Sequence, residues 1–440
     1  MVSTRAEAVA KINDCDGFNG QLSMMRKVLV LTHGFLPWGG AASERIAMFC
    51  RHLPTFGWHP LVLCASENSR HLFDEPEAAL SADGYQCWRV PDHTTWPLLR
   101  STGKAAVAWA RISQILLSAC TGFPDAYRLW SERCKPVASE ICQKEQPDVL
   151  LSTSPPHSIH LLAHYLHHRY GIPWVMDLRD AWLGNRRARF PTPLHCLIST
   201  LQYRRMIRET DAIVANSDVL GQMVASHLDK SARKVTVITN GFEESFFDGI
   251  TPWRLAEPPT CVVLYSGGTY GGFATRTMTV IGHALEKLTQ PGEVMLFAAG
   301  ELEGVPDGAG RCGPIGIGHQ SLTMVPRLLV GADILLLVMP SPEREKGSGT
   351  VFLKSYGYLR SGKPIIYIGP ENASWDLLVR FPGTYRHDWG EWSAIANTLV
   401  RLCRDRVDWT RDRIKQVSAF SWFELTRRLV DLFNAMTASK

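Results

Sequence analysis

The sequence has 440 residues, of which 45% are hydrophobic and 20% are charged, and its formal net charge is +5 at pH 7. This length predicts two domains, each large enough to bury a core of its own. The small and dispersed positive charge argues against a nucleic-acid partner, and no apolar run reaches the roughly 18 residues of a membrane span. We therefore expect a cytoplasmic protein, and weak contact with anionic lipid at the inner face of the plasma membrane stays open.

The eleven cysteines are an odd number and form no Cys-x-x-Cys motif. Several of them, such as Cys64 and Cys261, stand inside apolar runs. This pattern predicts reduced thiols in the core, and it argues against a disulfide framework or a zinc site.

The first half of the chain alternates short apolar runs with helical patterns. Residues 1–25 come before this series and contain no apolar stretch of signal-peptide length, so we expect a flexible N-terminal extension. Residues 26–245 should form the first domain, because such alternation is typical of a parallel sheet covered by helices on both faces. Its predicted strands cover residues 27–33, 59–65, 147–153, 173–179, 211–217 and 234–240.

The second half of the chain repeats the pattern after a break. Residues 246–260 lie in a stretch rich in glycine, proline and acidic residues, which is typical of a linker. A second α/β series then covers 261–408, and residues 409–440 end in an amphipathic helix. The predicted strands of this series cover residues 261–268, 293–300, 333–339 and 364–369. The fold class is thus α/β, with two doubly wound Rossmann-like domains in tandem.

The predicted strand over 173–179 ends in charged residues, which is unusual for a buried strand. Asp177 and Arg179 close it, and Asp180 follows directly. In open α/β sheets, ligands bind beyond the carboxyl ends of the strands. We therefore expect the two domains to face each other across a cleft and these three residues to line its wall. An ion pair between Arg179 and Asp180 that holds the loop together is the structural alternative.

Six stretches of the chain carry motifs that occur together in one known family. Residues 153–182 contain Pro-Pro-His-Ser-Ile-His, then Pro-Trp-Val, then Asp-Leu-Arg-Asp-Ala-Trp. The other five stretches are the glycine-rich segment 32–46, the segments 211–247, 331–339 and 352–368, and the helix over 420–433. In their order and spacing, the six stretches resemble bacterial family 4 glycosyltransferases of the GT-B fold, and the resemblance covers about residues 26–436.

The resemblance implies an activity and its partners. A member of this family is a retaining glycosyltransferase that moves a sugar, typically a hexose, from a nucleotide-sugar to a hydroxyl acceptor, with no metal cofactor. The acceptor would be a glycan or a lipid-linked sugar in the synthesis of bacterial surface polysaccharide or glycolipid. The second domain would bind the donor, and the last helices would cross back to the first domain.

The sequence departs from the family at one pair of positions. The family carries two glutamates eight positions apart, and the second of them binds the ribose of the nucleotide. Here Gly349 and Gly357 occupy these positions, although Lys354 and Tyr358 match the surrounding motif. A non-catalytic GT-B protein that binds a nucleotide or glycan within such a pathway therefore stays open, and so does a sugar-nucleotide epimerase of the same architecture.

The glycine-rich segment 345–354 is the main candidate for binding the donor phosphates. Gly349 would allow close backbone approach, Ser348 and Thr350 offer hydroxyls, and Lys354 brings a positive charge. Such loops before a helix bind anions through backbone N–H groups. The alternative is an ordinary loop that caps a helix.

Two further segments could contact the donor. Gly39 and Gly40 precede a predicted helix in the first domain, where the family contacts the reacting centre; a tight turn is the alternative. Arg276 follows the first strand of the second domain and could meet the phosphates; a solvated surface arginine is the alternative.

Residues 157–168 contain five histidines. His157 and His160 match the family motif and begin a predicted helix beyond a strand end, so we expect them to be catalytic groups that orient or deprotonate a hydroxyl. His164, His167 and His168 should form a solvated helix face. No cysteine or carboxylate joins them at ligand spacing in the sequence, so no metal site is predicted.

Residues 186–208 mix basic and apolar side chains. Such a segment could rest on an anionic membrane surface. A plain amphipathic helix of the core is the alternative.

Overall fold

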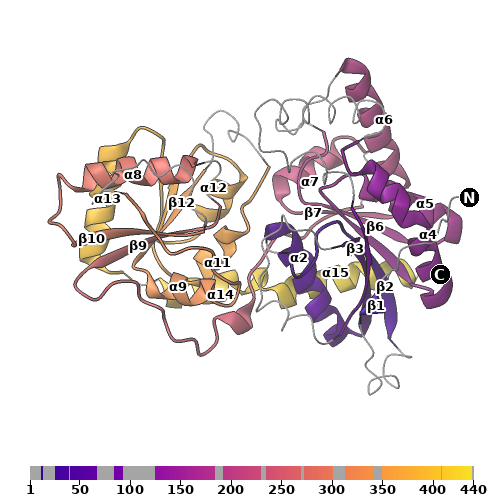
Figure 1. Cartoon of the computed structure of the whole chain (residues 1–440), viewed down its shortest axis with the longest axis horizontal. Helices are drawn as coiled ribbons and strands as arrows, with labels where there is room; N and C mark the ends of the chain where they lie inside the picture. The colour runs from indigo at the N-terminus through magenta and orange to yellow at the C-terminus, as the bar shows by residue number, and fades with distance from the viewer. Residues whose placement is uncertain are drawn as a thin grey trace, which may run out of the picture. The chain divides into compact units, whose positions relative to one another are not determined.

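The computed structural model describes residues 11–12, 25–38, 40–66, 84–92, 124–183, 192–228, 234–268, 272–300, 313–339, 349–407 and 409–438. The chain divides into two compact units, with boundaries between Ile238 and Thr239 and between Leu425 and Thr426. Each unit consists of one sheet with helices on its two faces (Figure 1). This is the α/β architecture of two doubly wound domains that the strand–helix alternation predicts.

The described part of the first unit contains a sheet of eight strands in the order β1-β4-β3-β2-β5-β6-β7-β8, parallel except for β1. Its strands are β1 (Lys11–Ile12), β2 (Arg26–Leu31), β3 (Trp58–Ala65), β4 (Gln86–Val90), β5 (Val149–Ser154), β6 (Trp174–Leu178), β7 (Ala212–Ala215) and β8 (Val235–Val237). Its helices are α2 (Ala41–His52), α4 (Arg128–Glu145), α5 (Ile159–Tyr170), α6 (Pro193–Glu209) and α7 (Asp218–Ala225), with a 3-10 turn over Leu53–Phe56.

The described part of the second unit contains a parallel sheet in the order β11-β10-β9-β12-β13-β14. Its strands are β9 (Cys261–Ser266), β10 (Val294–Ala299), β11 (Ile315–Gly316), β12 (Ile334–Val338), β13 (Ile365–Ile368) and β14 (Thr384–His387). Its helices are α8 (Phe273–Leu285), α9 (Val325–Gly331), α11 (Lys354–Arg360), α12 (Ala373–Leu378), α13 (Trp392–Asp405) and α14 (Thr410–Val417), with 3-10 turns over Glu244–Phe246 and Ser418–Phe420. Helix α15 (Trp422–Thr437) starts in this unit and ends in the first.

The strand order places a switch point in each sheet. The chain adds strands on one side of β2 and then continues with β5 on its other side, and β9 and β12 are related in the same way. Ligands of doubly wound sheets bind outside the carboxyl ends of the strands at such a point. The residues that follow β2 and β5, and those that follow β9 and β12, are therefore the first places to look for a site.

Both sheets are buried because their central strands are apolar on both faces. Val28, Leu29 and Val30 of β2 and Leu335 and Leu336 of β12 are fully buried. Continuous apolar runs of this kind suit parallel strands that helices cover on both sides. Each predicted strand corresponds to an observed one, within about three residues at either end.

The final helix contributes to the first unit. Phe433 packs on Trp58, with ring centroids 5.1 Å apart, and Asn434 Oδ1 accepts a hydrogen bond from Arg26 Nη1 at 3.0 Å. The last residues of the chain therefore cover the start of β2 and β3. None of the described helices combines the length and the apolar character that crossing a bilayer demands.

The prediction that Cys261 is a reduced thiol is wrong, because Cys261 forms a disulfide with Cys403. The disulfide joins the start of β9 to α13, and the two Cα atoms lie 5.6 Å apart. A separation of 142 residues leaves no local spacing from which the pair could be predicted. Cys64 is a buried free thiol, as expected.

The predicted N-terminal extension is described at three residues, which are 11, 12 and 25. Lys11 and Ile12 form β1, which pairs antiparallel with β4 at the edge of the first sheet. The remainder of the extension up to residue 24 lies outside the described residues.

Candidate functional site

The carboxyl ends of β2, β5 and β6 meet at one edge of the first sheet, because these strands are parallel neighbours. His33 follows β2 there, and its Nε2 lies 3.0 Å from Oδ2 of Asp92, which follows β4. Both residues are buried, and the imidazole packs against the rings of Tyr127 and Trp130 at centroid distances of 4.4 and 4.8 Å. This pair was not predicted from the sequence, although a histidine at the end of the apolar run 27–33 was the available signal.

Asp177 forms a buried ion pair with Arg45 of α2. Asp177 Oδ1 lies 2.8 Å from Arg45 Nη2, and Oδ2 accepts from Arg45 Nε at 3.2 Å and from the Thr153 hydroxyl at 2.7 Å. The same Nη2 donates to the carbonyl of Ile238 at 2.9 Å, and both charged residues are almost fully buried. The Asp177 side chain thus ties β5, β6 and α2 together inside the unit.

Arg179 holds the loop that follows β5. Its Nε donates to the carbonyl of Ser154 at 3.0 Å, and its Nη2 donates to the carbonyl of Pro155 at 2.7 Å. The other side of this loop is held by Asp125, whose carboxylate accepts from the backbone N–H of Ser158 at 2.9 Å. The guanidinium therefore fixes the Pro-Pro turn, which places His157 at the sheet edge.

His160 lies inside a polar chain under the turn. Its Nδ1 is 2.8 Å from Ser152 Oγ, which accepts a hydrogen bond from Trp174 Nε1 at 2.7 Å. The Ser152 hydroxyl can accept from the indole N–H and donate to Nδ1 at the same time, and in that tautomer the imidazole proton is on Nε2. Within the described ranges Nε2 has no hydrogen-bond partner, and the residue is fully buried. Such an unsatisfied donor costs about 1–3 kcal/mol, and a ligand oxygen would satisfy it.

His157 is the more accessible of the two motif histidines. Its ring stacks on Trp182, with centroids 4.9 Å apart and an interplanar angle of 12°, and the residue is partly exposed. Burial of the ring and, secondly, the charge of Arg179 lower the pKa of His157 to about 3. Burial likewise lowers the pKa of His160 well below 6.5. Both imidazoles are neutral at pH 7 and are weak bases, so the site favours orientation of a hydroxyl over its deprotonation.

The later histidines of α5 were expected on a solvated helix face, but His164 and His167 are largely covered, and the half-exposed His168 also has a partner in the protein. Glu209 lies at the end of α6. Its Oε2 is 2.5 Å from Nε2 of His164 and 2.6 Å from Nε2 of His168. His167 Nδ1 donates to the carbonyl of Ile172 at 2.8 Å. A carboxylate thus joins these histidines from a helix that is distant in sequence.

Lys354 lies at the carboxyl end of β9, at the switch point of the second sheet. Its Nζ is 3.0 Å from the hydroxyl of Tyr265 and 4.1 Å from the centroid of that ring. A Cβ atom added to Gly267, directly after β9, would meet Nζ at 2.8 Å, so the ammonium lies against this glycine backbone. Burial lowers the pKa of Lys354 from 10.5 to about 7. The sheet edge thus presents an amine whose protonated form a nearby anion would stabilise.

The rest of the Lys354 motif anchors the same edge. Tyr358 Oη accepts from the backbone N–H of Ser266 at 2.8 Å, and the carbonyl of Thr350 accepts from Ser374 Oγ at 3.1 Å. A Cβ atom added to Gly357 would make only an ordinary contact, 3.4 Å from a methyl group of Leu329. Packing therefore does not require a glycine at this position.

The remaining predicted donor residues are distributed over both units. Gly40 precedes α2 with a φ of 106°, a conformation that favours glycine. Arg276 lies exposed in the first turn of α8. Gly39 and Ser348 lie outside the described residues.

Comparison with known proteins assigns a domain to the first unit. Residues 40–241 match the sequence model of the glycosyl transferase 4-like domain. The first unit is therefore similar to this family. The matched stretch contains Arg45, His157, His160, Asp177 and Arg179, so the buried network described above lies within it. No curated protein matches the sequence.

Solved structures extend the likeness of fold beyond the glycosyl transferase 4-like domain to both units. Sucrose-phosphate synthase from Thermosynechococcus elongatus superposes with a TM-score of 0.62 at 12% identity, over 94% of this chain and 100% of that one. HepE of Anabaena, solved in complex with UDP, superposes with a TM-score of 0.59 at 12% identity, over 93% of this chain and 100% of that one. WaaG, a glycosyltransferase involved in lipopolysaccharide biosynthesis, superposes with a TM-score of 0.58 at 11% identity, over 92% of this chain and 99% of that one. The family match and the fold together support a glycosyltransferase of the GT-B type.

Proposed function

We propose that the protein transfers a sugar from a nucleotide-sugar donor to a hydroxyl acceptor, with retention of configuration and without a metal cofactor. The observation that carries this proposal is the placement of the family motif: His157 and the buried network around Asp177 and Arg179 lie at the carboxyl edge of the first sheet. The acceptor is a glycan or lipid-linked sugar of the bacterial surface, and the protein works in the cytoplasm. The likeness to WaaG and the UDP bound in HepE support this choice of substrates.

The proposed mechanism assigns separate tasks to the two units. The second unit binds the diphosphate of the donor, and Lys354 offsets the negative charge that grows as the nucleotide leaves. In the first unit, the neutral imidazole of His157 orients a hydroxyl by hydrogen bonding, and His160 positions it through their shared packing on Trp182. Arg179 keeps the turn in place, together with Asp125.

The second candidate is a non-catalytic protein that binds a nucleotide or glycan in the same pathway. Gly349 and Gly357 favour it, because they replace the two glutamates of the family motif. Incubation with a panel of radiolabelled sugar nucleotides separates the two functions. Release of sugar, or its transfer to an added acceptor, supports the enzyme; tight binding without turnover of any donor supports the alternative.

Donor binding should depend on the protonation of Lys354. Its pKa is about 7, and a bound diphosphate stabilises the charged form. Below pH 7 the ammonium is already protonated, whereas above pH 7 binding must take up a proton, so the affinity for UDP should fall by up to about tenfold per pH unit. Calorimetric titration with UDP between pH 6 and 9 measures this slope.

Two variants test the assignment to Lys354. In Lys354→Met the decline above pH 7 should disappear, whereas Lys287→Met, which removes an exposed lysine of the same unit, should retain it. A Lys354→Met protein with the wild-type pH dependence would refute the contact. If the folded wild type bound neither UDP nor GDP, the proposed donor site in the second unit would be refuted.

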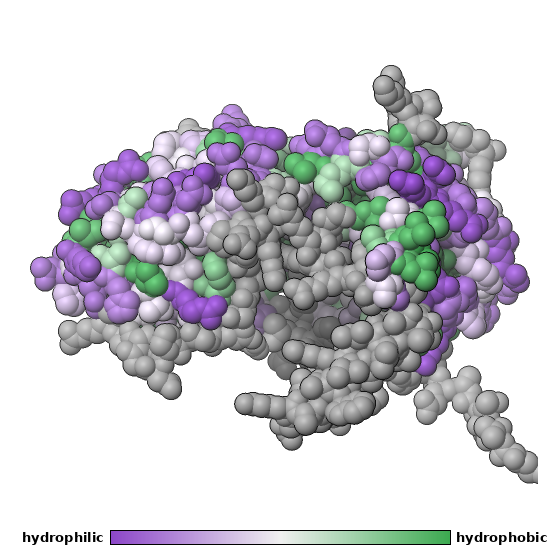
Figure 2. Space-filling view, turned by 90° about the horizontal axis from the view of Figure 1, so that it is seen from above, coloured by the Kyte–Doolittle hydropathy of each residue, from purple (hydrophilic) through white to green (hydrophobic). Residues whose placement is uncertain are grey.

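Helix α6 is proposed as a membrane contact. Its outer face exposes Leu194, Leu197 and Leu201 by 62%, 55% and 56%, at the spacing of one helical stripe. Figure 2 shows hydrophobic residues gathered on the first unit, on the side where α6 lies in Figure 1. The exposed Arg204 and Arg208 follow on the same helix and would meet anionic headgroups. The core-helix alternative accounts for the inner face of α6 and leaves these leucines unexplained.

Removal of the leucine stripe should weaken binding to anionic vesicles. A fully buried leucine contributes roughly 1.5–3 kcal/mol, so the double change Leu197→Asp with Leu201→Asp should lower partitioning by more than about tenfold. Cosedimentation with phosphatidylglycerol vesicles measures it. Leu288→Asp, which changes an exposed leucine of the second unit, serves as the control. Equal partitioning of both variants would show that α6 does not face the membrane.

A further inference from the structure

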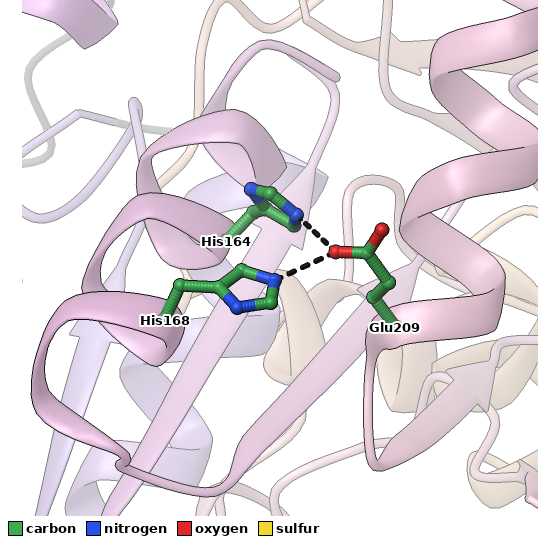
Figure 3. A group of neighbouring side chains, drawn as sticks. All are labelled: His164, His168 and Glu209. Carbon is green, nitrogen blue, oxygen red and sulfur yellow. Dashed lines mark hydrogen bonds and ion pairs between the residues drawn. The ribbon is translucent and has the colours of Figure 1, made fainter.

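Three side chains from two helices converge at one point of the first unit. His164 and His168 are four residues apart on α5, so they project from the same face of that helix. Glu209 is the last residue of α6, and Figure 3 shows both imidazoles turned toward its carboxylate. The ligand atoms of the three residues all lie within 4.8 Å of one another.

We propose that His164, His168 and Glu209 bind a divalent transition-metal ion, with zinc as the best match. Two imidazole nitrogens and one carboxylate oxygen form a donor set that zinc accepts, and water can complete the tetrahedron. Magnesium prefers oxygen ligands and should not compete. This site lies one helical turn from His160 on α5, but none of its three ligands is assigned to sugar transfer, and it does not depend on the proposed function.

The distances require only a small adjustment to admit the ion. Oε2 of Glu209 lies 2.5 Å from Nε2 of His164 and 2.6 Å from Nε2 of His168. Around a tetrahedral zinc ion with ligand distances of about 2.0–2.2 Å, neighbouring ligand atoms lie roughly 3.3–3.5 Å apart. A rotation of the flexible glutamate side chain that moves its carboxylate by less than about 1 Å provides this space. Both imidazoles then bind through Nε2 and carry their proton on Nδ1.

The surroundings orient the carboxylate and leave a path for the ion. Arg205 Nε donates to Oε1 of Glu209 at 2.8 Å, which directs Oε2 toward the two imidazoles. The side chain of His164 is 15% exposed and packs against the edge of Trp174, whereas that of His168 is 52% exposed. One ligand is therefore fixed in the protein and another opens to solvent. A bound ion would join α5 to the end of α6, the helix with the exposed leucine stripe.

The experiment uses the full chain after treatment with a chelator and dialysis. Calorimetric titration with Zn²⁺ should show a site with a stoichiometry of one per chain, and Mg²⁺ should give no saturable signal. A hundredfold excess over the dissociation constant should raise the melting temperature of the first unit by roughly 5–10 °C. Titration with Co²⁺ should give the visible bands of nitrogen and oxygen ligation without a thiolate charge-transfer band, which excludes binding by the free cysteines.

Variants connect the signal to the three residues. Loss of a residue that only hydrogen-bonds a metal ligand weakens metal binding by about 10–100-fold. Because His168 and Glu209 would bind the ion directly, His168→Gln and Glu209→Gln should each weaken Zn²⁺ binding by at least this factor. His283→Gln removes an exposed histidine that lies 3.8 Å from Glu286 in the second unit, and it should bind like the wild type. Because the side chain of His168 is half-exposed, its replacement should disturb the fold less than the replacement of Glu209. Equal Zn²⁺ affinity of His168→Gln and the wild type, or the absence of stoichiometric binding, would overturn the proposal.

Discussion

Replacement of Arg45 by methionine should destabilise the first unit by about 3–5 kcal/mol, because it leaves the carboxylate of Asp177 buried without its charged partner. Both side chains are at most 1% exposed, and Asp177 receives two hydrogen bonds from the guanidinium. Such a loss corresponds to a fall in melting temperature of roughly 6–20 °C for a domain of this size. Thermal unfolding followed by circular dichroism measures it.

Two comparisons test whether the buried charge is the cause. Arg51→Met changes an exposed arginine of the same helix and should shift the melting temperature little. The triple variant Arg45→Met, Thr153→Val and Asp177→Leu replaces the polar cluster by apolar groups and should recover much of the stability. Equal stability of Arg45→Met and Arg51→Met would mean that the ion pair does not hold α2 to the sheet.

Replacement of His157 by alanine should lower turnover by about 10²-fold on any sugar nucleotide that the wild type accepts. The expected loss is that of one hydrogen bond aimed at the reacting groups. Because the pKa of His157 is about 3, the imidazole stays neutral between pH 5 and 8. The ratio of the wild-type rate to the variant rate should therefore be constant over this range, and initial rates at several pH values measure it.

His160 and an unrelated histidine provide the controls for His157. His160 is fully buried between Trp174 and Trp182, so His160→Ala should lower the melting temperature as well as the rate. His227→Ala, which changes an exposed histidine of the same unit, should alter neither. A rate ratio for His157→Ala that titrates near pH 6.5 would contradict the neutral role and indicate a general base.

Ten strands of the two sheets followed from the sequence, because burial on both faces imposes apolar runs. The runs over 59–65 and 333–339 are examples, and they became β3 and β12. The strands β1, β4, β11 and β14 were not predicted. In β4, for example, four of the five residues are only half-buried and give no continuous apolar signal. The family motif was likewise visible, because its residues follow one another over 153–182.

The partners of the charged residues could not be predicted from the sequence. Asp177 appeared beside Arg179 in the sequence, but its salt bridge is with Arg45, which is 132 residues away. His164 and His168 meet Glu209 only because α6 packs against α5, and Cys261 meets Cys403 across 142 residues. The sequence by itself determined which segments are buried strands and where the family motif lies, since both depend on local order along the chain. The tertiary structure alone decided which side chain each polar group meets, because that depends on distances that folding creates between distant segments.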